Sequence, residues 1–235
     1  MRILNWNLEF APPASPRGLA IAEVIQERDA EVVCLTETHE HWSMHGGHWI
    51  WAERDYGYEQ RGDRRKVGLW SREPWTEVDP VGHPDLPSGR FVAGTTETSI
   101  GPLRLVGVCI PWRAAHVSTG RRDRSPWEDH VTYLRALAER IPTWLEGPPL
   151  VVTGDYNQRV PRRHTPAAVH EELDRAFTPL DFVTAGPVPG LDAPVIDHVA
   201  VGPALGARSV EGISRMVDGR RVSDHDGVVV DLVAG

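Results

Sequence analysis

The sequence contains only two cysteines, one lysine and no hydrophobic run long enough to cross a membrane. Cys34 and Cys109 each lie inside an apolar segment, which excludes a secreted scaffold held together by disulfides. A bilayer crossing needs about 18 consecutive apolar residues, so we expect no membrane span. Residues 1–4 enter a strand-like pattern at once and lack the pattern of a signal peptide. We therefore expect a cytoplasmic protein.

The chain has no excess of positive charge, because 25 basic residues stand against 33 acidic ones and give a formal net charge of −8. This balance excludes a protein that coats nucleic acid by charge alone. Lys66 is the single lysine, and the other 24 basic residues are arginines. Such a bias is typical of GC-rich coding, so a cluster of arginines does not by itself indicate a binding site.

Repeats and low-complexity blocks are also absent, and 235 residues with 40% hydrophobic composition can bury one substantial core. Short β-rich apolar runs alternate with amphipathic helical stretches, which favours a layered α/β domain. We expect helices at 16–28, 127–145 and 165–177, and strands at 3–8, 32–35, 49–53, 58–61, 66–72, 91–100, 103–110, 150–153, 195–201, 207–216 and 227–233. The Pro/Gly-rich segment 186–194 separates two strands that both look buried. It is expected to be a loop, so residues 1–235 form one domain.

Polar residues recur inside or at the ends of five of these strands, namely Asn5 and Asn7, Glu37, Asp155 and Asn157, Asp197, and Asp224 with His225. Ligands of α/β sheets bind at strand ends, where such side chains can converge. Each residue alone is compatible with ordinary turn chemistry. Asp197 is the exception, because a carboxylate within an apolar strand is costly unless it is paired. The joint occurrence therefore favours a functional site.

Six stretches in this order resemble the endonuclease/exonuclease/phosphatase superfamily, which includes deoxyribonuclease I and exonuclease III-like enzymes. They are LNWN (4–7), LTE (35–37), VGLWSR (67–72), GDYN (154–157), IDHV (196–199) and SDH (223–225). The resemblance extends along the whole chain. It implies a four-layered α/β sandwich, in which two packed mixed β-sheets are flanked by helices.

The resemblance implies a bound Mg²⁺ or Mn²⁺ with Glu37 as its principal ligand and Asn7 and Asp224 beside it. Carboxylate and amide oxygens suit such hard cations. A cation held there offsets the charge repulsion that makes phosphodiesters resistant to attack.

The resemblance also implies catalytic roles. Asp155 would orient or deprotonate the attacking water, and Asn157 and Asn7 would donate hydrogen bonds to phosphate oxygens. His225 would contact the scissile phosphate, and Asp197 would orient its ring. An aspartate on the other ring nitrogen favours the imidazolium, so the pair should raise the pKa of His225.

The sequence departs from the superfamily pattern at residues 109–112, where Cys109 and Trp112 stand in place of a phosphate-contacting Tyr or His and a following Asn. Arg113 or His116 is therefore expected to supply the phosphate contact. Trp112 can stack on a base or sugar, although packing of its long loop is the alternative that we favour.

Two arginine clusters, Arg121, Arg122 and Arg124 and then Arg159, Arg162 and Arg163, follow predicted strands. Contact with substrate phosphates and a solvated surface are equally good interpretations. A third group, Arg61, Arg64, Arg65 and Lys66, is expected to form a solvated hairpin turn.

Four histidines crowd the segment after Glu37, at positions 39, 41, 45 and 48. They lack the i, i+4 helical spacing of a zinc protease motif. Substrate contact is therefore a better interpretation than zinc binding.

These residues predict a divalent-metal-dependent hydrolase of phosphate esters, with a nuclease that acts by in-line water attack as the favoured class. The first alternative is a phosphatase or phosphodiesterase that acts on a small phosphorylated molecule or a lipid head group. The acidic net charge and the altered segment at 109–112 favour this alternative. A non-catalytic binding module would have lost Glu37, Asp155 or His225, and all three are present. The sequence indicates no obligate protein partner.

Overall fold

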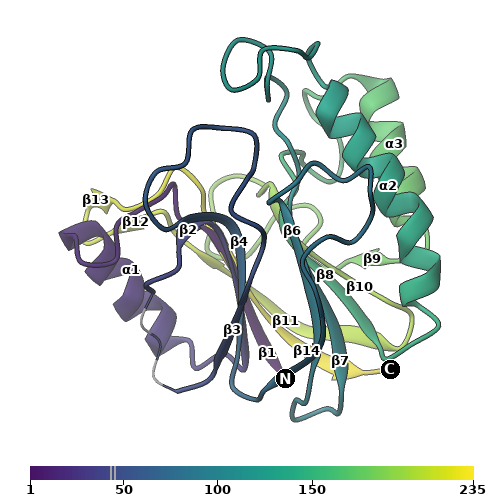
Figure 1. Cartoon of the computed structure of the whole chain (residues 1–235). Helices are drawn as coiled ribbons and strands as arrows, with labels where there is room; N and C mark the ends of the chain where they lie inside the picture. Colours follow the sequence, from purple (N-terminus) through teal and green to yellow (C-terminus); the bar gives the residue numbers. More distant parts are fainter. Residues whose placement is uncertain (43, 45) are drawn as a thin grey trace.

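The computed structural model describes residues 1–42, 44 and 46–235, and its strands form two large sheets that pack face to face (Figure 1). The strands of the first sheet are, from edge to edge, β11 (Leu205–Ile213), β14 (Gly227–Ala234), β1 (Arg2–Asn7), β2 (Val32–His39), β4 (Arg64–Ser71) and β3 (His48–Trp51). Those of the second are β5 (Trp75–Asp79), β6 (Phe91–Thr96), β7 (Leu103–Cys109), β8 (Leu150–Asp155), β10 (Asp197–Val201) and β9 (Asp181–Phe182). Two short strands, β12 (Met216–Val217) and β13 (Arg220–Arg221), pair with each other.

Helix α1 (Pro16–Glu27) covers the outer face of the first sheet (Figure 1). The side chain of Ser15 accepts a hydrogen bond from the Gly18 N–H, and a proline occupies the first helical turn, both of which favour a helix start. The apolar face of α1 places Ile21 and Ile25 in a buried cluster with residues of β1 and β2. The helix therefore forms the first layer of the fold.

Helices α2 (Glu128–Trp144) and α3 (Ala167–Phe177) cover the outer face of the second sheet (Figure 1). Leu134, Leu137 and Leu173 share a buried cluster with residues of β6, β7 and β8. A separate cluster, rich in Val, Ile and Leu from both sheets, fills the space between them. The order helix, sheet, sheet, helix confirms the four-layered sandwich expected from the sequence.

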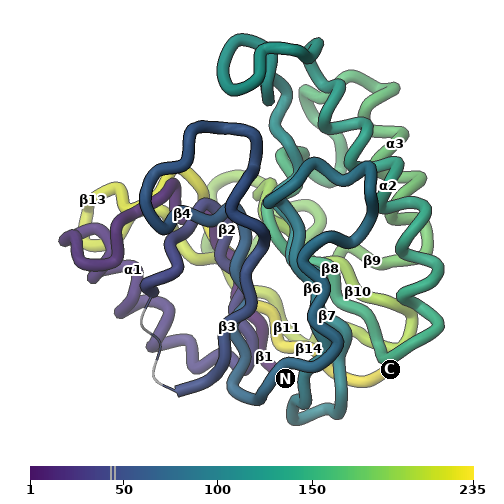
Figure 2. The backbone as a smooth tube through the Cα atoms, viewed as in Figure 1, coloured from purple at the N-terminus to yellow at the C-terminus, as the bar shows by residue number. Residues whose placement is uncertain are grey.

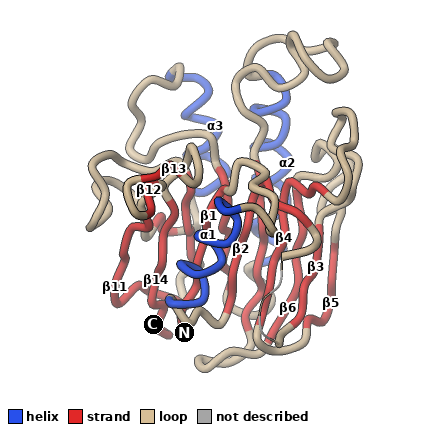
Figure 3. The backbone as a smooth tube through the Cα atoms, turned by 90° about the vertical axis from the view of Figure 1, so that its left-hand side faces the viewer, coloured by secondary structure: helices blue, strands red, loops and turns tan. Residues whose placement is uncertain are grey.

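Strand directions bring the sequence-predicted site residues to one end of the two sheets. β1 runs parallel to β2, whereas β14 is antiparallel to β1 and β10 is antiparallel to β8. The carboxyl ends of β1, β2 and β8 therefore meet the amino ends of β10 and β14 at the top of Figure 3, and both chain termini lie at the opposite end. Figure 2 shows the loops after β3 (52–63) and after β7 (110–127), which rise above the site end.

Most predicted elements are present, with two differences near residue 60. The predicted strand at 58–61 is a loop, and Arg64, Arg65 and Lys66 begin β4 instead of forming a solvated turn. Arg65 and Lys66 are buried, because β4 pairs with both β2 and β3. Strand β5 has an exposed face and was not predicted. None of the helices described has the length and hydrophobicity that a bilayer crossing requires.

A buried hydrogen-bond network connects α2, α3 and β10 to the loop that follows β8. Nε2 of Gln158 lies 2.7 Å from Nε2 of His130, and Oε1 of Gln158 lies 2.9 Å from Nδ1 of His170. Nε2 of His198 lies 3.1 Å from the carbonyl oxygen of Gln158. Burial lowers the pKa of both His130 and His198 to about 4, so both rings are neutral at pH 7.

We expect the contribution of His130 and His198 to the free energy of unfolding to fall as the pH drops from about 6.5 toward 4, against the opposite contribution of Asp155, whose pKa is raised. In the unfolded chain His130 and His198 take up protons near pH 6.5, whereas in the folded protein they resist protonation until about pH 4. Each ring then destabilises the fold by up to about 3 kcal/mol at the lower pH. Urea unfolding followed at several pH values measures this slope.

His198→Gln should flatten the slope, since it removes one of these groups. The matched control is His164→Gln on the exposed surface, which should leave the slope unchanged. Equal slopes for the wild type and His198→Gln would contradict the assignment.

Candidate active site

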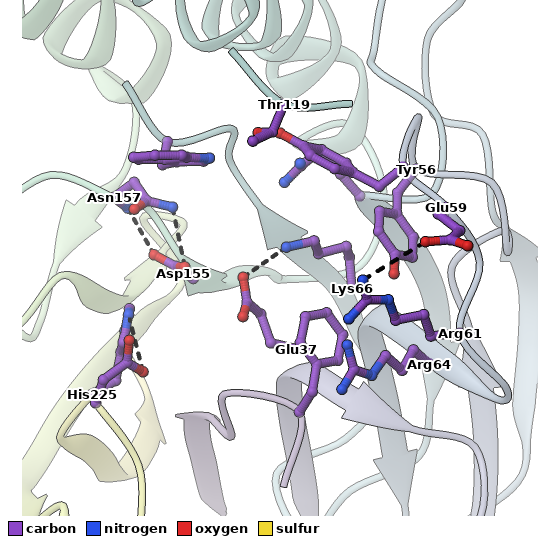
Figure 4. A pocket seen from close by; sticks show the side chains of 15 residues that line it. Glu37, Tyr56, Glu59, Arg61, Arg64, Lys66, Thr119, Asp155, Asn157 and His225 are labelled. Atoms are coloured by element: carbon purple, nitrogen blue, oxygen red, sulfur yellow. Dashed lines mark hydrogen bonds and ion pairs between the residues drawn. The ribbon is translucent and has the colours of Figure 1, made fainter. Parts of the chain in front are cut away.

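A cavity of about 490 Å³ opens at the end of the sheets where the polar residues converge (Figure 4). One wall carries acidic, amide and imidazole groups, the opposite wall carries cations, and Glu37 lies between them. The first wall contains Asp155, Asn157 and His225, and the second contains Arg61, Arg64 and Lys66. Asp224 and Arg90 also line the cavity. Aromatic side chains also line the cavity, namely Phe10, Tyr56, Tyr58 and Trp112.

His225 and Asp197 form a buried ion pair. Nδ1 of His225 lies 2.5 Å from Oδ2 of Asp197, and Nε2 of His225 is 3.9 Å from the nearest oxygen of Asp224. Burial alone would lower the pKa of His225, but Asp197 and Asp155 outweigh it and raise the pKa to about 10. The ring is therefore an imidazolium at neutral pH, with Nε2–H available as a donor.

Asp155 is held by amide donors on both of its oxygens. Nδ2 of Asn7 and Nδ2 of Asn157 each donate to Oδ2 over 3.1 Å, and the Asn157 N–H donates to Oδ1 over 2.8 Å. Burial raises the pKa of Asp155 to about 7, and Asp197 and Glu37 contribute to the shift. A fixed carboxyl group with a pKa near 7 is suited to act as a general base.

Asn157 has a different set of contacts from the one expected. Its second amide hydrogen is donated to the carbonyl oxygen of Ile110 over 2.9 Å, so both hydrogens are used within the protein. In this structure Asn157 positions Asp155, and its donation to a phosphate stays a prediction. Asn7 differs, because its oxygen accepts one bond from the Glu9 N–H over 2.9 Å and retains a lone pair for a ligand.

Glu37 projects into the cavity from a local irregularity of β2. Its backbone has φ of +45°, in the left-handed region that non-glycine residues rarely adopt. Such strain is concentrated at functional sites. Oε1 of Glu37 lies 2.6 Å from Nζ of Lys66, and this ammonium outweighs the effect of burial and lowers the pKa of Glu37. The carboxylate is therefore ionised at neutral pH.

The donor atoms at the cavity fit a hard divalent cation. Glu37 and Asp224 line the cavity and offer carboxylate oxygens. Asn7 is buried next to Asp155 and does not line the cavity itself, but it retains an amide oxygen lone pair. Such an all-oxygen set is what Mg²⁺ and Mn²⁺ prefer. Oδ1 of Asp197 is buried without a hydrogen-bond partner in the described part of the chain, which adds to the negative potential there.

Asp155, Asp197 and His225 also offer ligand atoms that lie within 4.8 Å of one another. This arrangement does not require a metal, because the imidazolium compensates the charge of the two carboxylates. This trio is therefore an ion-pair cluster, and a cation held by Glu37, Asn7 and Asp224 stays a prediction from the sequence.

Among the predicted substrate contacts, Trp112 lines the cavity and its side chain is half exposed. Arg113, Arg121, Arg122 and Arg159 do not line it. Nη2 of Arg121 forms an ion pair with Asp129 at 3.3 Å. Nε of Arg159 donates to the carbonyl oxygen of Pro194, at 3.0 Å, which holds this side chain at a loop.

The expectation that His116 contacts substrate is corrected by its burial. Its side chain is inaccessible, and its ring lies against the ring of Tyr58 with the centroids 4.4 Å apart. The His116 N–H also donates to the Tyr58 hydroxyl over 3.1 Å. His116 therefore supports an aromatic residue of the cavity wall from behind.

His39, His41 and His48 do not line the cavity either. Nδ1 of His39 and Nδ1 of His41 lie 2.7 and 2.6 Å from the two oxygens of Asp63. Both histidines therefore bind a carboxylate and not a substrate. His45 lies outside the described residues.

Sequence reasoning missed the cationic wall. Lys66 and Arg90 were not predicted as site residues, and Arg64 was placed in a solvated turn. One signal was available for Lys66, since it is the single lysine among 25 basic residues. Arg90 gave no comparable signal, because a charged residue directly before an apolar strand is common.

A model of the Endonuclease/Exonuclease/phosphatase family matches residues 4–225. The chain belongs to this family. Its members are metal-dependent nucleases and phosphatases, so the chain is a hydrolytic phosphoesterase, as the sequence predicted. A comparison with curated proteins returned no match.

Solved structures of low sequence identity share the fold. A 3′-5′ exonuclease (NExo) from Neisseria meningitidis is 18% identical, with a TM-score of 0.73 over 98% of this chain and 99% of that one. TDP2 of D. rerio, complexed with single-strand DNA product, is 14% identical, with a TM-score of 0.71 over 100% and 99%. The human Nocturnin catalytic domain with a bound sulfate anion is 15% identical, with a TM-score of 0.70 over 100% and 93%.

We expect Asp197 and His225 to act as a unit. His225→Ala and Asp197→Asn should each lower kcat by about 10²- to 10⁴-fold, because the first removes the imidazolium and the second removes the charge that holds it. The double variant should be little worse than the worse single variant, since residues that act together are not additive.

Steady-state kinetics with a chromogenic phosphodiester measures this cycle, with the thermal unfolding midpoint of each variant as the control for folding. Losses that multiply in the double variant would show that the two residues act independently.

Proposed function

We propose that this protein is a Mg²⁺- or Mn²⁺-dependent nuclease that hydrolyses phosphodiester bonds of single-stranded nucleic acid. The observation that carries the proposal is the juxtaposition, in one cavity, of an oriented carboxylate, an imidazolium and an oxygen-rich cation site. These are Asp155, His225 and the group around Glu37. A nuclease fits the family, in which nucleases and phosphatases occur together.

The cavity size supports a single strand as the substrate. Its volume of about 490 Å³ falls within the range of roughly 300–1,000 Å³ that is typical of small-ligand pockets. Tyr58 and Trp112 line it and can stack on a base. Single strands present splayed bases, whereas a duplex must first be unpaired.

The chain's own residues supply the steps of hydrolysis. Asp155 accepts a proton from water as the water oxygen forms its bond to phosphorus, and the phosphorus–oxygen bond to the leaving group breaks in line. Nε2–H of His225 donates to a phosphoryl oxygen and stabilises the developing charge. Glu37, Asn7 and Asp224 would hold the cation. When bound, a divalent cation there supplies Lewis-acid stabilisation of the phosphoryl oxygens.

A phosphatase or phosphodiesterase of a small phosphorylated molecule is the second candidate. The net charge of −8 favours it, since a small substrate requires no broad basic surface. A cytoplasmic location and the absence of an obligate protein partner stay predictions from the sequence.

Glu37→Gln should raise the Mg²⁺ concentration needed for half-maximal activity at least tenfold, because the cation loses an anionic ligand. Activity titrated with Mg²⁺ and Mn²⁺ after EDTA treatment measures the shift. Glu59→Gln is the matched control, since Glu59 lines the same cavity with a largely exposed carboxylate. Full wild-type activity in excess EDTA would contradict the metal requirement.

Substrate class can be decided by matched oligonucleotides. We expect a labelled single strand to be cleaved about tenfold or more faster than the same strand in a duplex, because unpairing costs a few kcal/mol. Inositol phosphates and bis-p-nitrophenyl phosphate form the comparison arm. Rapid turnover of the small substrates with intact oligonucleotides would favour the second candidate.

A further inference from the structure

Arg90, which directly precedes β6, is a fully buried guanidinium that has no ion pair within the described ranges. Its side chain is 1% exposed, and it lines the cavity. Nη1 makes two long contacts, 3.4 Å to the carbonyl oxygen of Cys109 and 3.8 Å to its sulfur. Nε and Nη2 are buried and have no hydrogen-bond partner in the described chain.

A guanidinium is always charged, and a buried charge without a partner is strongly unfavourable. The long contacts to Cys109 do not explain why this charge is retained. Burial raises the pKa of the Cys109 thiol to about 12, so the sulfur offers no negative charge. A neutral side chain could contact the same carbonyl oxygen without the penalty. Arg90 is therefore suited to interact with something that the protein does not itself contain.

Two other cations that line the cavity are also only partly compensated. Arg64 lies over the ring of Phe10, with its guanidinium carbon 4.6 Å from the ring centroid, and makes no ion pair within the described residues. Nζ of Lys66 contacts Glu37, which is the single carboxylate within ion-pair distance of it in the described chain. Figure 4 shows Lys66 and Arg64 on the side of Glu37 away from Asp155 and His225. This wall thus concentrates positive charge beside the hydrolytic residues.

We propose that Arg64, Lys66 and Arg90 form a second anion subsite, which binds a phosphate group next to the one being hydrolysed. The inference rests on the proposed function and narrows its substrate class to molecules with two neighbouring phosphates. Arg90 acts through its buried, unpaired charge, and Lys66 and Arg64 contact the phosphate oxygens. Nucleic acid strands and bisphosphorylated nucleotides share this chemistry.

Dinucleotides that differ by one phosphate test the subsite. The rate of cleavage of the internucleotide bond is measured for TpT, pTpT and TpTp at saturating Mg²⁺. We expect one of the two phosphorylated dinucleotides to have a kcat/KM at least about tenfold above that of TpT, since charge-assisted hydrogen bonds are strong. Arg90→Gln should remove most of this preference and change TpT cleavage much less.

Arg72→Gln is the matched control, because Arg72 follows the opposite end of β4 in an exposed ion pair with Asp29. It should retain the preference. Equal losses on all three dinucleotides in Arg90→Gln, or no preference in the wild type, would overturn the subsite. Cleavage of oligonucleotides without hydrolysis of free adenosine 3′,5′-bisphosphate would identify nucleic acid strands as the source of the second phosphate. Hydrolysis of the bisphosphate without cleavage of oligonucleotides would identify nucleotides.

Two measurements separate this inference from the proposed function and from a purely structural role. Inorganic phosphate binding by calorimetry in EDTA needs no hydrolysis, and it should weaken at least about tenfold in Arg90→Gln. Without added phosphate, Arg90→Gln should unfold at or above the temperature at which the wild type unfolds, because the substitution removes an unpaired buried charge. Unchanged phosphate binding, or a lower unfolding temperature, would overturn the proposal. Should Arg90→Gln fail to fold, Arg64→Gln tests the same preference.

Discussion

Asp155 and Asp197 lie directly opposite each other on β8 and β10, and both are almost completely buried. Two carboxylates so placed repel each other and have lost their water, so they must be compensated within the protein. The compensation comes from His225 on one side and from the amides of Asn7 and Asn157 on the other. These partners come from other strands and loops, and the strand directions within the two packed sheets bring them to the same end.

The layers were predictable because each depends on a local pattern. Buried strands such as β8 are continuous apolar runs, and α1 has an N-cap serine followed by proline. The chemistry of the hydrolytic wall was also predictable, because Asp197 interrupts an apolar strand and has to be paired. The register that places Asp197 opposite Asp155 could not be predicted from the sequences of β8 and β10, because it depends on long-range strand pairing.

The cationic wall illustrates a limit of composition. Arginine is so frequent in this chain that the presence of Arg61, Arg64 and Arg90 in the sequence did not indicate a binding site. Arg90 is fully buried and Arg64 is partly buried, whereas Arg61 is exposed. Burial is decided by strands that pair with β4 and β6 from elsewhere in the chain. Local polarity around residues 61–66 pointed to a turn, but pairing with β2 extends β4 to Arg64.

Loop conformation sets a second limit. Trp112 and His116 belong to one segment and were both considered as substrate contacts, Trp112 by stacking and His116 at the phosphate, yet Trp112 lines the cavity and His116 does not. The backbone at His116 has φ of +56°, and the ring packs behind Tyr58. A left-handed residue that is not glycine has no reliable sequence signature. The different positions of the Trp112 and His116 side chains could therefore not be predicted from the sequence.

The indole N–H of Trp6 donates to the carbonyl oxygen of His225 over 2.9 Å, across 219 positions of sequence. The first and last strands of the sheet are thus neighbours, and closing this contact requires a loop that includes almost the whole chain. A partly synthesised chain that lacks residues 225–234 has neither His225 nor strand β14. We therefore expect hydrolytic capacity to require both strands, so that a fragment produced by proteolysis between them and separated from its partner should be inert.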